Sequence, residues 1–136
     1  MVMDRNITFM SFGYSFGQPK HADLILDARG FECAGKELRK KYTGLSKPYQ
    51  NAFYSMDVFT LMYNKLKGNV KDFLSSTERD VVIAIGCHRG KHRSVAIVEK
   101  LAIELNGCTQ HVNIQEKYKS LISKKRNEKY SFIYDT

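Results

Sequence analysis

The residues best suited to chemistry lie in one cationic, glycine-containing loop between an apolar run and a helix. Residues 81–85 are continuously β-branched or apolar, which indicates a strand buried on both faces of a mostly parallel sheet. Residues 95–105 repeat apolar side chains at helical spacing, with Glu99 on the opposite face and Gly107 placed to end the helix. The loop between these two elements consists of Cys87, His88, Arg89, Gly90, Lys91, His92, Arg93 and Ser94.

This loop predicts a binding site for an anion such as a phosphate or a carboxylate. At a junction of strand and helix, several backbone N–H groups have no intrahelical partner, and the helix dipole adds partial positive charge. Gly90 lets the backbone approach a ligand closely, and the flanking basic side chains add full charges. The alternative is an ordinary turn whose basic side chains are merely solvated. The spacing does not fit the ATP-binding Walker motif, so nucleoside triphosphate hydrolysis is not supported.

Length and composition predict one small α/β domain. The chain has 136 residues, of which 43% are hydrophobic and 26% are charged, as in ordinary globular proteins. We expect a single three-layer domain with a small, mostly parallel sheet, a core over about residues 7–114 and a basic tail at 115–136. Further strands and helices are expected at residues 7–12, 22–26, 110–114, 36–41 and 56–67.

Charge and cysteine content narrow the class of partner and the compartment. A net charge of +8 favours polyanionic partners such as RNA, although it also serves plain solubility. Cys33, Cys87 and Cys108 form no CxxC pair, so we expect a reducing, cytoplasmic location, no metal site and no cofactor. The amino-terminal residues do not read as a signal peptide, and apolar runs stay well short of the roughly 20 residues of a membrane span, so no membrane partner is expected.

Polar residues also lie at the ends of the first two predicted strands. Ser11 lies near the end of one, and Asp27 and Arg29 follow the other. In open α/β sheets ligands sit outside the carboxyl ends of the strands, so parallel neighbours would bring these residues to the cationic loop. Arg29 would then be a second phosphate clamp, and Asp27 an acceptor for a hydroxyl or an amine. Alternatively, Asp27 and Arg29 only pair with each other or cap a turn.

Motifs in a fixed order along the chain carry a family resemblance. They are SFGY at 11–14 with GQP at 17–19, ADL and DAR within 22–29, LR at 38–39 with TGLSKP at 43–48, and AIGC at 84–87 with GKHRSVA at 90–96. Over about residues 7–105 the chain resembles the C-terminal domain of the RNase adapter protein RapZ, without the N-terminal nucleotide-binding domain. The resemblance implies a fold related to sugar-phosphate-binding domains, binding of glucosamine-6-phosphate and of small regulatory RNA, and self-association into a homo-oligomer.

The loop departs from the family pattern. The family usually has Thr-Gly after the cysteine, whereas this chain has His88 and Arg89, which make the pocket more basic and bulkier. The change keeps the preference for an anion, and together with the resemblance, which implies an amino-sugar phosphate as the ligand, it leads us to expect a non-enzymatic binding domain. The expected ligand-binding residues are Ser11, Asp27, Arg29, Cys87, His88, Gly90, Lys91, His92, Arg93 and Ser94.

Two basic clusters with tyrosines among them are the expected RNA surface. Tyrosine rings can stack on unpaired bases while lysines contact phosphates. The alternative is that these charged side chains are only exposed to solvent on helix faces and bind no RNA. The expected RNA-binding residues are Lys36, Arg39, Lys40, Lys41 and Lys47 in one cluster, and Lys124, Lys125 and Arg126 in the other.

The loop also fits the pattern Cys-x-x-Gly-x-x-Arg-Ser of cysteine-dependent phosphatases. In that alternative function Cys87 is the nucleophile, Arg93 holds the phosphate oxygens, and Asp57 or Asp27 protonates the leaving oxygen. Cys87 is otherwise a small buried residue at a strand end, the usual state of a free cysteine.

Overall fold

The chain folds around a four-stranded, fully parallel β-sheet. The structure is a computed structural model and describes residues 5–114. The strands lie in the order β2-β3-β1-β4. Their bounds are β1 (Ile7–Gly13), β2 (Leu24–Asp27), β3 (Val81–Cys87) and β4 (Cys108–His111). The predicted α/β class with a small parallel sheet is therefore confirmed.

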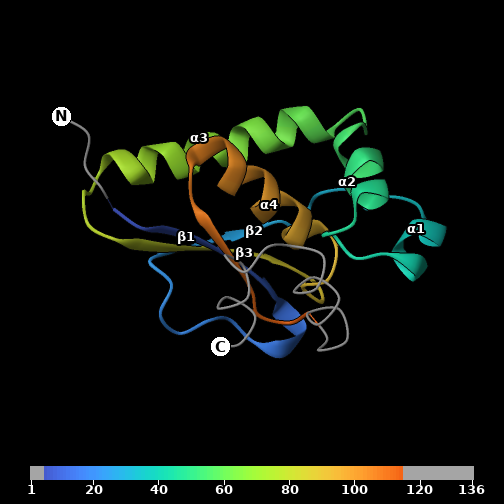
Figure 1. Cartoon of the computed structure of the whole chain (residues 1–136), viewed down its shortest axis with the longest axis horizontal. Coiled ribbons are helices and arrows are strands. Elements are labelled where there is room, and N and C mark those ends of the chain that lie inside the picture. The colour runs from blue at the N-terminus through green and yellow to red at the C-terminus, as the bar shows by residue number, and fades with distance from the viewer. Residues whose placement is uncertain (1–4, 115–136) are drawn as a thin grey trace.

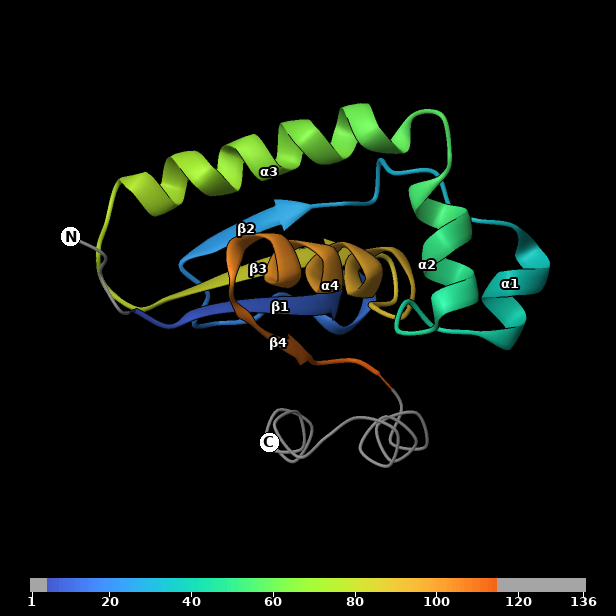
Figure 2. The same cartoon turned by 45° about the horizontal axis from the view of Figure 1, so that its top comes forward.

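The helices lie over the faces of the sheet and beyond the carboxyl ends of its strands (Figure 1 and Figure 2). They are η1 (Tyr14–Phe16, a 3₁₀ turn), α1 (Lys36–Lys41), α2 (Lys47–Tyr54), α3 (Phe59–Ser75) and α4 (Arg93–Leu105). Helices α3 and α4 cover one face of the sheet, and η1 lies on the other side (Figure 1). Helices α1 and α2 stand beyond the carboxyl ends of the strands (Figure 2).

The core lies between the sheet and the pair α3 and α4. Every second side chain of the two central strands, β1 and β3, points to this side of the sheet. Three of them are fully buried there: Phe9, Ile83 and Ile85. Helix α4 packs against them through Val98 and Leu101. Helix α3 adds one stripe at helical spacing, made of Phe59, Tyr63, Leu66 and Val70. Strand β3 is buried over nearly its whole length, which explains its unbroken apolar sequence.

Helix α2 is the longer of two elements that the sequence analysis missed, the other being the 3₁₀ turn η1. Ser46 stands at its N-cap and Pro48 lies in its first turn, where the missing N–H costs nothing. Read alone, Ser-Lys-Pro looks like a bend. Helix α3 also runs to Ser75, beyond the predicted end at residue 67, and β4 covers 108–111 rather than 110–114.

Helix α4 ends differently from the prediction. Its C-cap is Asn106, which adopts the left-handed conformation at φ 58°, so Gly107 does not end the helix. Gly107 is needed for space, because a Cβ there would lie 2.7 Å from the Phe9 ring. Among the described residues, no helix is long and apolar enough to cross a membrane.

Two glycine substitutions test the packing at the end of β1. Gly13→Ala is expected to lower the free energy of unfolding by about 2 kcal/mol, because its Cβ would lie 2.3 Å from the carbonyl carbon of Arg89. The control Gly68→Ala lies in α3 with no atom within 4 Å of the new Cβ, and should raise it by about 0.8 kcal/mol. Urea unfolding of both variants is the measurement. Equal midpoints would contradict the assigned contact.

Candidate anion-binding site

The loop after β3 packs directly against the end of β1, backbone to backbone. A Cβ on Gly90 would lie 2.6 Å from the amide nitrogen of Gly13, and a Cβ on Gly13 would lie 2.3 Å from the carbonyl carbon of Arg89. Gly90 also has φ +70°, in the region that favours glycine. Both positions therefore need glycine, and the loop is fixed against β1 with no side chain between them.

Three backbone hydrogen bonds bring other segments to this loop and to the end of β3. The N–H of Ser15 in η1 donates to the carbonyl of His88 at 3.0 Å, and the N–H of Gly44 donates to that of Lys91 at 3.0 Å. The N–H of Ala28, just after β2, donates to Gly86 at 2.7 Å. The ends of β1, β2 and β3 therefore meet at one place, as the sequence analysis expected for parallel neighbours.

The start of α4 offers backbone donors at the same place. His92 is the N-cap residue, and its side chain makes no capping hydrogen bond to the first turn. The first amides of any helix lack intrahelical acceptors, and the helix dipole makes this end partially positive. An anion seated at the loop would therefore meet both the amides of α4 and the loop's own positive charge.

Cys87 and Ser94 form the buried floor of the loop. Both side chains are almost completely buried, and the Cys87 Sγ lies 3.1 Å from the Ser94 Oγ. The Ser94 hydroxyl also approaches the carbonyl of Phe12 at 3.4 Å. These contacts link β1, β3 and α4 beneath the turn.

The cationic side chains of the loop take different directions. Arg93 donates from Nη1 to the carbonyls of Arg29 and Phe31, at 2.8 and 2.9 Å, and so joins the start of α4 to the segment after β2. His88 is exposed, whereas Lys91 is half-buried. Arg93 is therefore held beside the end of β2 by two hydrogen bonds.

His92 has a bonding role toward α1. Its Nε2 lies 2.8 Å from the carbonyl oxygens of Arg39 and Tyr42. Since both partners are acceptors, Nε2 carries the hydrogen and donates to both. Burial lowers the pKa of His92, which favours this neutral form. A contact between His92 and a phosphate stays a prediction.

Asp27 and Arg29 form a two-point ion pair. The Nε and Nη2 of Arg29 donate to the carboxylate oxygens of Asp27 at 2.8–3.1 Å. The Arg29 guanidinium also lies 3.9 Å from the centroid of the Tyr14 ring. Hydrogen bonding from Arg29 holds the pKa of Asp27 below its usual range. Of the two alternatives for these residues, pairing is what the structure shows, and their contact with a ligand stays a prediction.

Ser11 belongs to a buried network that sequence reasoning missed. Its hydroxyl lies 2.6 Å from Nδ1 of His111, whose Nε2 lies 2.8 Å from a carboxylate oxygen of Glu99. All three side chains are buried, so the placement of Glu99 on a polar helix face was wrong. The network joins β1, β4 and α4 behind the loop. No local pattern signals it, because its members are 12 and 100 residues apart.

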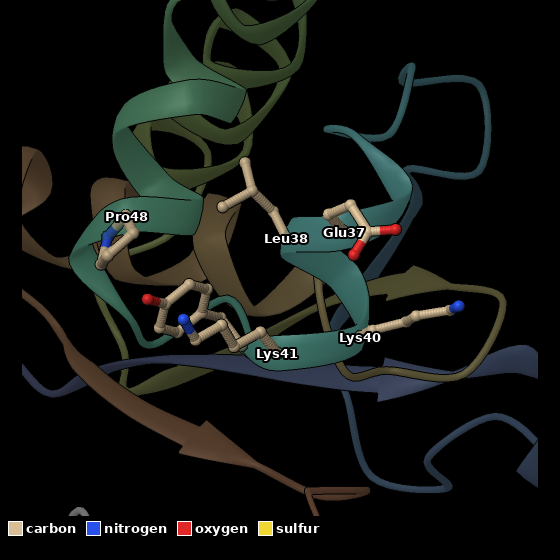
Figure 3. Close-up of a pocket in the computed structure, with 6 residues that line it drawn as sticks. Glu37, Leu38, Lys40, Lys41 and Pro48 are labelled. Carbon is tan, nitrogen blue, oxygen red and sulfur yellow. The ribbon is translucent and has the colours of Figure 1, made fainter.

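A basic surface pocket lies between α1 and α2. Lys40 and Lys41 come from the last turn of α1 and Pro48 from the start of α2, with Tyr42, Leu38 and Glu37 completing the wall (Figure 3). The Lys41 Nζ lies 5.7 Å from the centroid of the Tyr42 ring. Because His92 is bonded to the backbone of this segment, the pocket is tied to the cationic loop.

Other predicted residues stand apart from the loop or outside the described part. Asp57 is exposed, in the connection between α2 and α3. Lys36 and Lys47 begin α1 and α2, in the same region as the basic pocket. Lys124, Lys125 and Arg126 lie outside the described residues.

Comparison with known proteins decides the family. A family model described as the RapZ C-terminal domain matches residues 5–120. The chain belongs to the RapZ C-terminal domain family. Similar proteins named nucleotide-binding protein occur in Clostridium acetobutylicum (32% identical, 82% of this chain and 40% of the relative), in Pseudoalteromonas atlantica (35%, 85% and 42%) and in Leifsonia xyli (37%, 75% and 36%).

The match is to part of these relatives. The chain spans about two fifths of their length, and corresponds to their C-terminal part. Within residues 5–114 of this RapZ C-terminal domain, no group of three or more His, Cys, Asp or Glu side chains is placed to hold a metal ion.

The burial of His92 predicts a pH dependence of stability. Because burial lowers its pKa in the folded protein, the unfolded chain takes up the proton first as the pH falls through about 6.5. Wild type should therefore lose free energy of unfolding between pH 7 and pH 5. His92→Gln keeps an N–H donor without a titrating group and should lose less.

Urea unfolding at both pH values measures this difference. The matched control is His21→Gln, at an exposed position, which should follow wild type. The assignment is contradicted when His92→Gln shows the same loss between pH 7 and pH 5 as wild type.

Proposed function

We propose that this RapZ C-terminal domain binds a phosphorylated small molecule at the loop formed by Cys87–Ser94. One observation supports this proposal: three features lie together at the loop. They are a glycine turn fixed against β1, the uncapped N-terminus of α4 and the Arg93 guanidinium. Each of these is a recognised device for holding phosphate oxygens. The relatives' printed name, nucleotide-binding protein, also supports a phosphorylated ligand.

An amino-sugar phosphate, with glucosamine-6-phosphate as the first candidate, is the ligand that we propose. The phosphate would lie on the loop amides and Arg93. The Asp27 carboxylate is held ionised beside the loop by Arg29 and suits an amino or hydroxyl group of the same molecule. This pairing of an anion site with a neighbouring carboxylate favours a ligand that carries both a phosphate and an amine.

We also propose that the basic pocket between α1 and α2 binds RNA. Lys40 and Lys41 are placed to contact phosphates, and the neighbouring Tyr42 ring offers a surface for an unpaired base. Each contact of this kind is modest and sensitive to salt, so several copies in a homo-oligomer would strengthen binding through multiple attachment.

The close approach of Cys87 and Ser94 favours a second candidate function, a cysteine-dependent phosphatase. A hydroxyl 3.1 Å from the thiol can donate a hydrogen bond to a thiolate and stabilise it as a nucleophile. The almost complete burial of Cys87 counts against direct attack on phosphorus. Binding without turnover therefore remains our first proposal.

Calorimetric titration with glucosamine-6-phosphate and with inorganic phosphate tests the ligand site. Wild type should bind saturably, and Arg93→Ala should lose about 100-fold or more in affinity, because a charge-assisted contact is removed. The matched control Arg79→Ala removes an exposed arginine just before the amino end of β3 and should bind as wild type does. Unchanged affinity in Arg93→Ala would overturn the site assignment.

The same mixtures separate binding from catalysis. After titration with glucosamine-6-phosphate, they are assayed for released inorganic phosphate. Our first proposal expects no release. Release that disappears in Cys87→Ser would establish the phosphatase instead.

Charge reversal tests the RNA surface. The double variant Lys40→Glu, Lys41→Glu should weaken RNA binding and reduce the slope of log affinity against log salt by about two, one for each lost phosphate contact. The control double variant Lys65→Glu, Lys71→Glu makes the same charge change at exposed positions of α3. Gel-shift titrations over a salt series measure both. Equal weakening in the two variants would indicate a general charge effect and no specific surface at α1.

A further inference from the structure

A cavity of about 370 Å³ lies between α3 and the end of β2. Strand β2 is at the edge of the sheet, and its last two residues, Leu26 and Asp27, line the cavity. Helix α3 and Phe31 supply the rest of the wall. The volume falls in the lower part of the range for sites that hold small molecules. Of its lining residues, the function proposed above uses only Asp27.

The wall of the cavity is mainly apolar. Phe31 and Leu66 are buried, Met62 is half-buried, and Leu61 is exposed, so the wall runs from the core to the surface. The polar residues of the wall are Asp27, Lys65 and Asn69. A wall of this composition suits an apolar group that carries a few polar atoms.

The cavity adjoins the anion loop through β2 and the segment that follows it. Asp27 pairs with Gly86 of β3, the residue directly before Cys87, and is therefore one strand spacing, about 5 Å, from the start of the loop. The carbonyl of Phe31 accepts a hydrogen bond from Nη1 of Arg93 at 2.9 Å. A ligand whose phosphate lies on the loop and Arg93 can therefore extend past Asp27 into the cavity.

Asp27 determines which chemical group fits between the loop and the cavity. Its carboxylate is already paired with Arg29 at 2.8 Å, so it gains little from a second cation. A neutral N–H can still donate to it, because a carboxylate has about four acceptor positions. An ammonium group beside an apolar wall would also lose hydration. An amide nitrogen suits both surroundings and, unlike a hydroxyl, keeps its hydrogen while it carries a substituent.

We infer that the cavity is a subsite for an acyl group, and that the ligand is an amino-sugar phosphate acylated on its nitrogen. This inference rests on the proposed function of the loop and names the class of ligand more closely. The amide N–H would donate to Asp27, and the acyl carbonyl would accept from the side-chain amide of Asn69. The acyl chain would lie against Met62 and Leu66.

Calorimetric titration with acyl chains of increasing length tests the subsite. The probes are glucosamine-6-phosphate and its N-acetyl and N-butanoyl derivatives. Wild type should bind the N-butanoyl compound about 15-fold more tightly than the N-acetyl compound, because two more methylene groups are buried. The N-butanoyl sugar without its phosphate should bind at least about 100-fold more weakly, because it lacks the contacts with the loop.

Leu61→Gln and Ile103→Gln are a matched pair of variants. Both residues are exposed on helices, at 76% and 78%, so neither change disturbs the core. Leu61 lines the cavity, whereas Ile103 lies in α4 and does not. Leu61→Gln should reduce the preference for the N-butanoyl over the N-acetyl compound about threefold, because part of the apolar contact is lost. Ile103→Gln should keep the wild-type preference.

Each result of these titrations decides the inference. If the N-butanoyl compound binds no more tightly than the N-acetyl one while glucosamine-6-phosphate still binds, the acyl subsite is overturned and the proposed function of the loop stands. A preference that is unchanged in Leu61→Gln overturns the assignment to this cavity. Equal binding without the phosphate overturns the connection between cavity and loop. Wild type that binds none of the phosphorylated probes contradicts the proposed function itself, and the inference with it.

Discussion

The contact between the end of β1 and the loop after β3 is the constraint on which the rest of the site depends. Gly13 and Gly90 leave no room for a Cβ on either side, so the two backbones set each other's position. The register that pairs Gly13 with Cys87 brings both strands to this point at the same level. The contact with β1 therefore fixes where α4 begins relative to the strand ends, and the first amides of α4 face the space beyond those ends.

The anion loop supports a second surface, the basic pocket of α1. The anion loop and the basic pocket of α1 are joined by His92 and by the hydrogen bond from Gly44 to Lys91. Gly44 itself allows no Cβ, since one would lie 2.2 Å from the carbonyl oxygen of His92. A ligand that shifts the turn would therefore shift the backbone that carries Lys40 and Lys41. In this fold, the proposed ligand site and the proposed RNA surface have a short mechanical connection.

The sequence was sufficient where local pattern decides structure, and insufficient where distant segments do. The apolar run of β3 and the amphipathic α4 predicted a strand, a turn and a helix, and parallel neighbours predicted that Asp27 and Arg29 come to the loop. It could not predict that His92 turns toward α1, or that Ser11 is bonded to His111, since these partners lie 50 and 100 residues away. Helix α2 was missed because a serine N-cap followed by proline is also the pattern of a turn.

The same contacts bear on whether the loop holds a phosphate ester or cleaves it. Cleavage requires an acid to protonate the leaving oxygen. Asp27 is unsuited, because Arg29 holds its pKa low and keeps it ionised, and Asp57 is exposed in the connection from α2 to α3. The nitrogens of His111 are both bonded within a buried network. Among the described residues, these contacts supply donors and charge for holding a phosphate, and the two aspartates considered as the acid are not placed for that role, which supports our proposal of binding over that of cleavage.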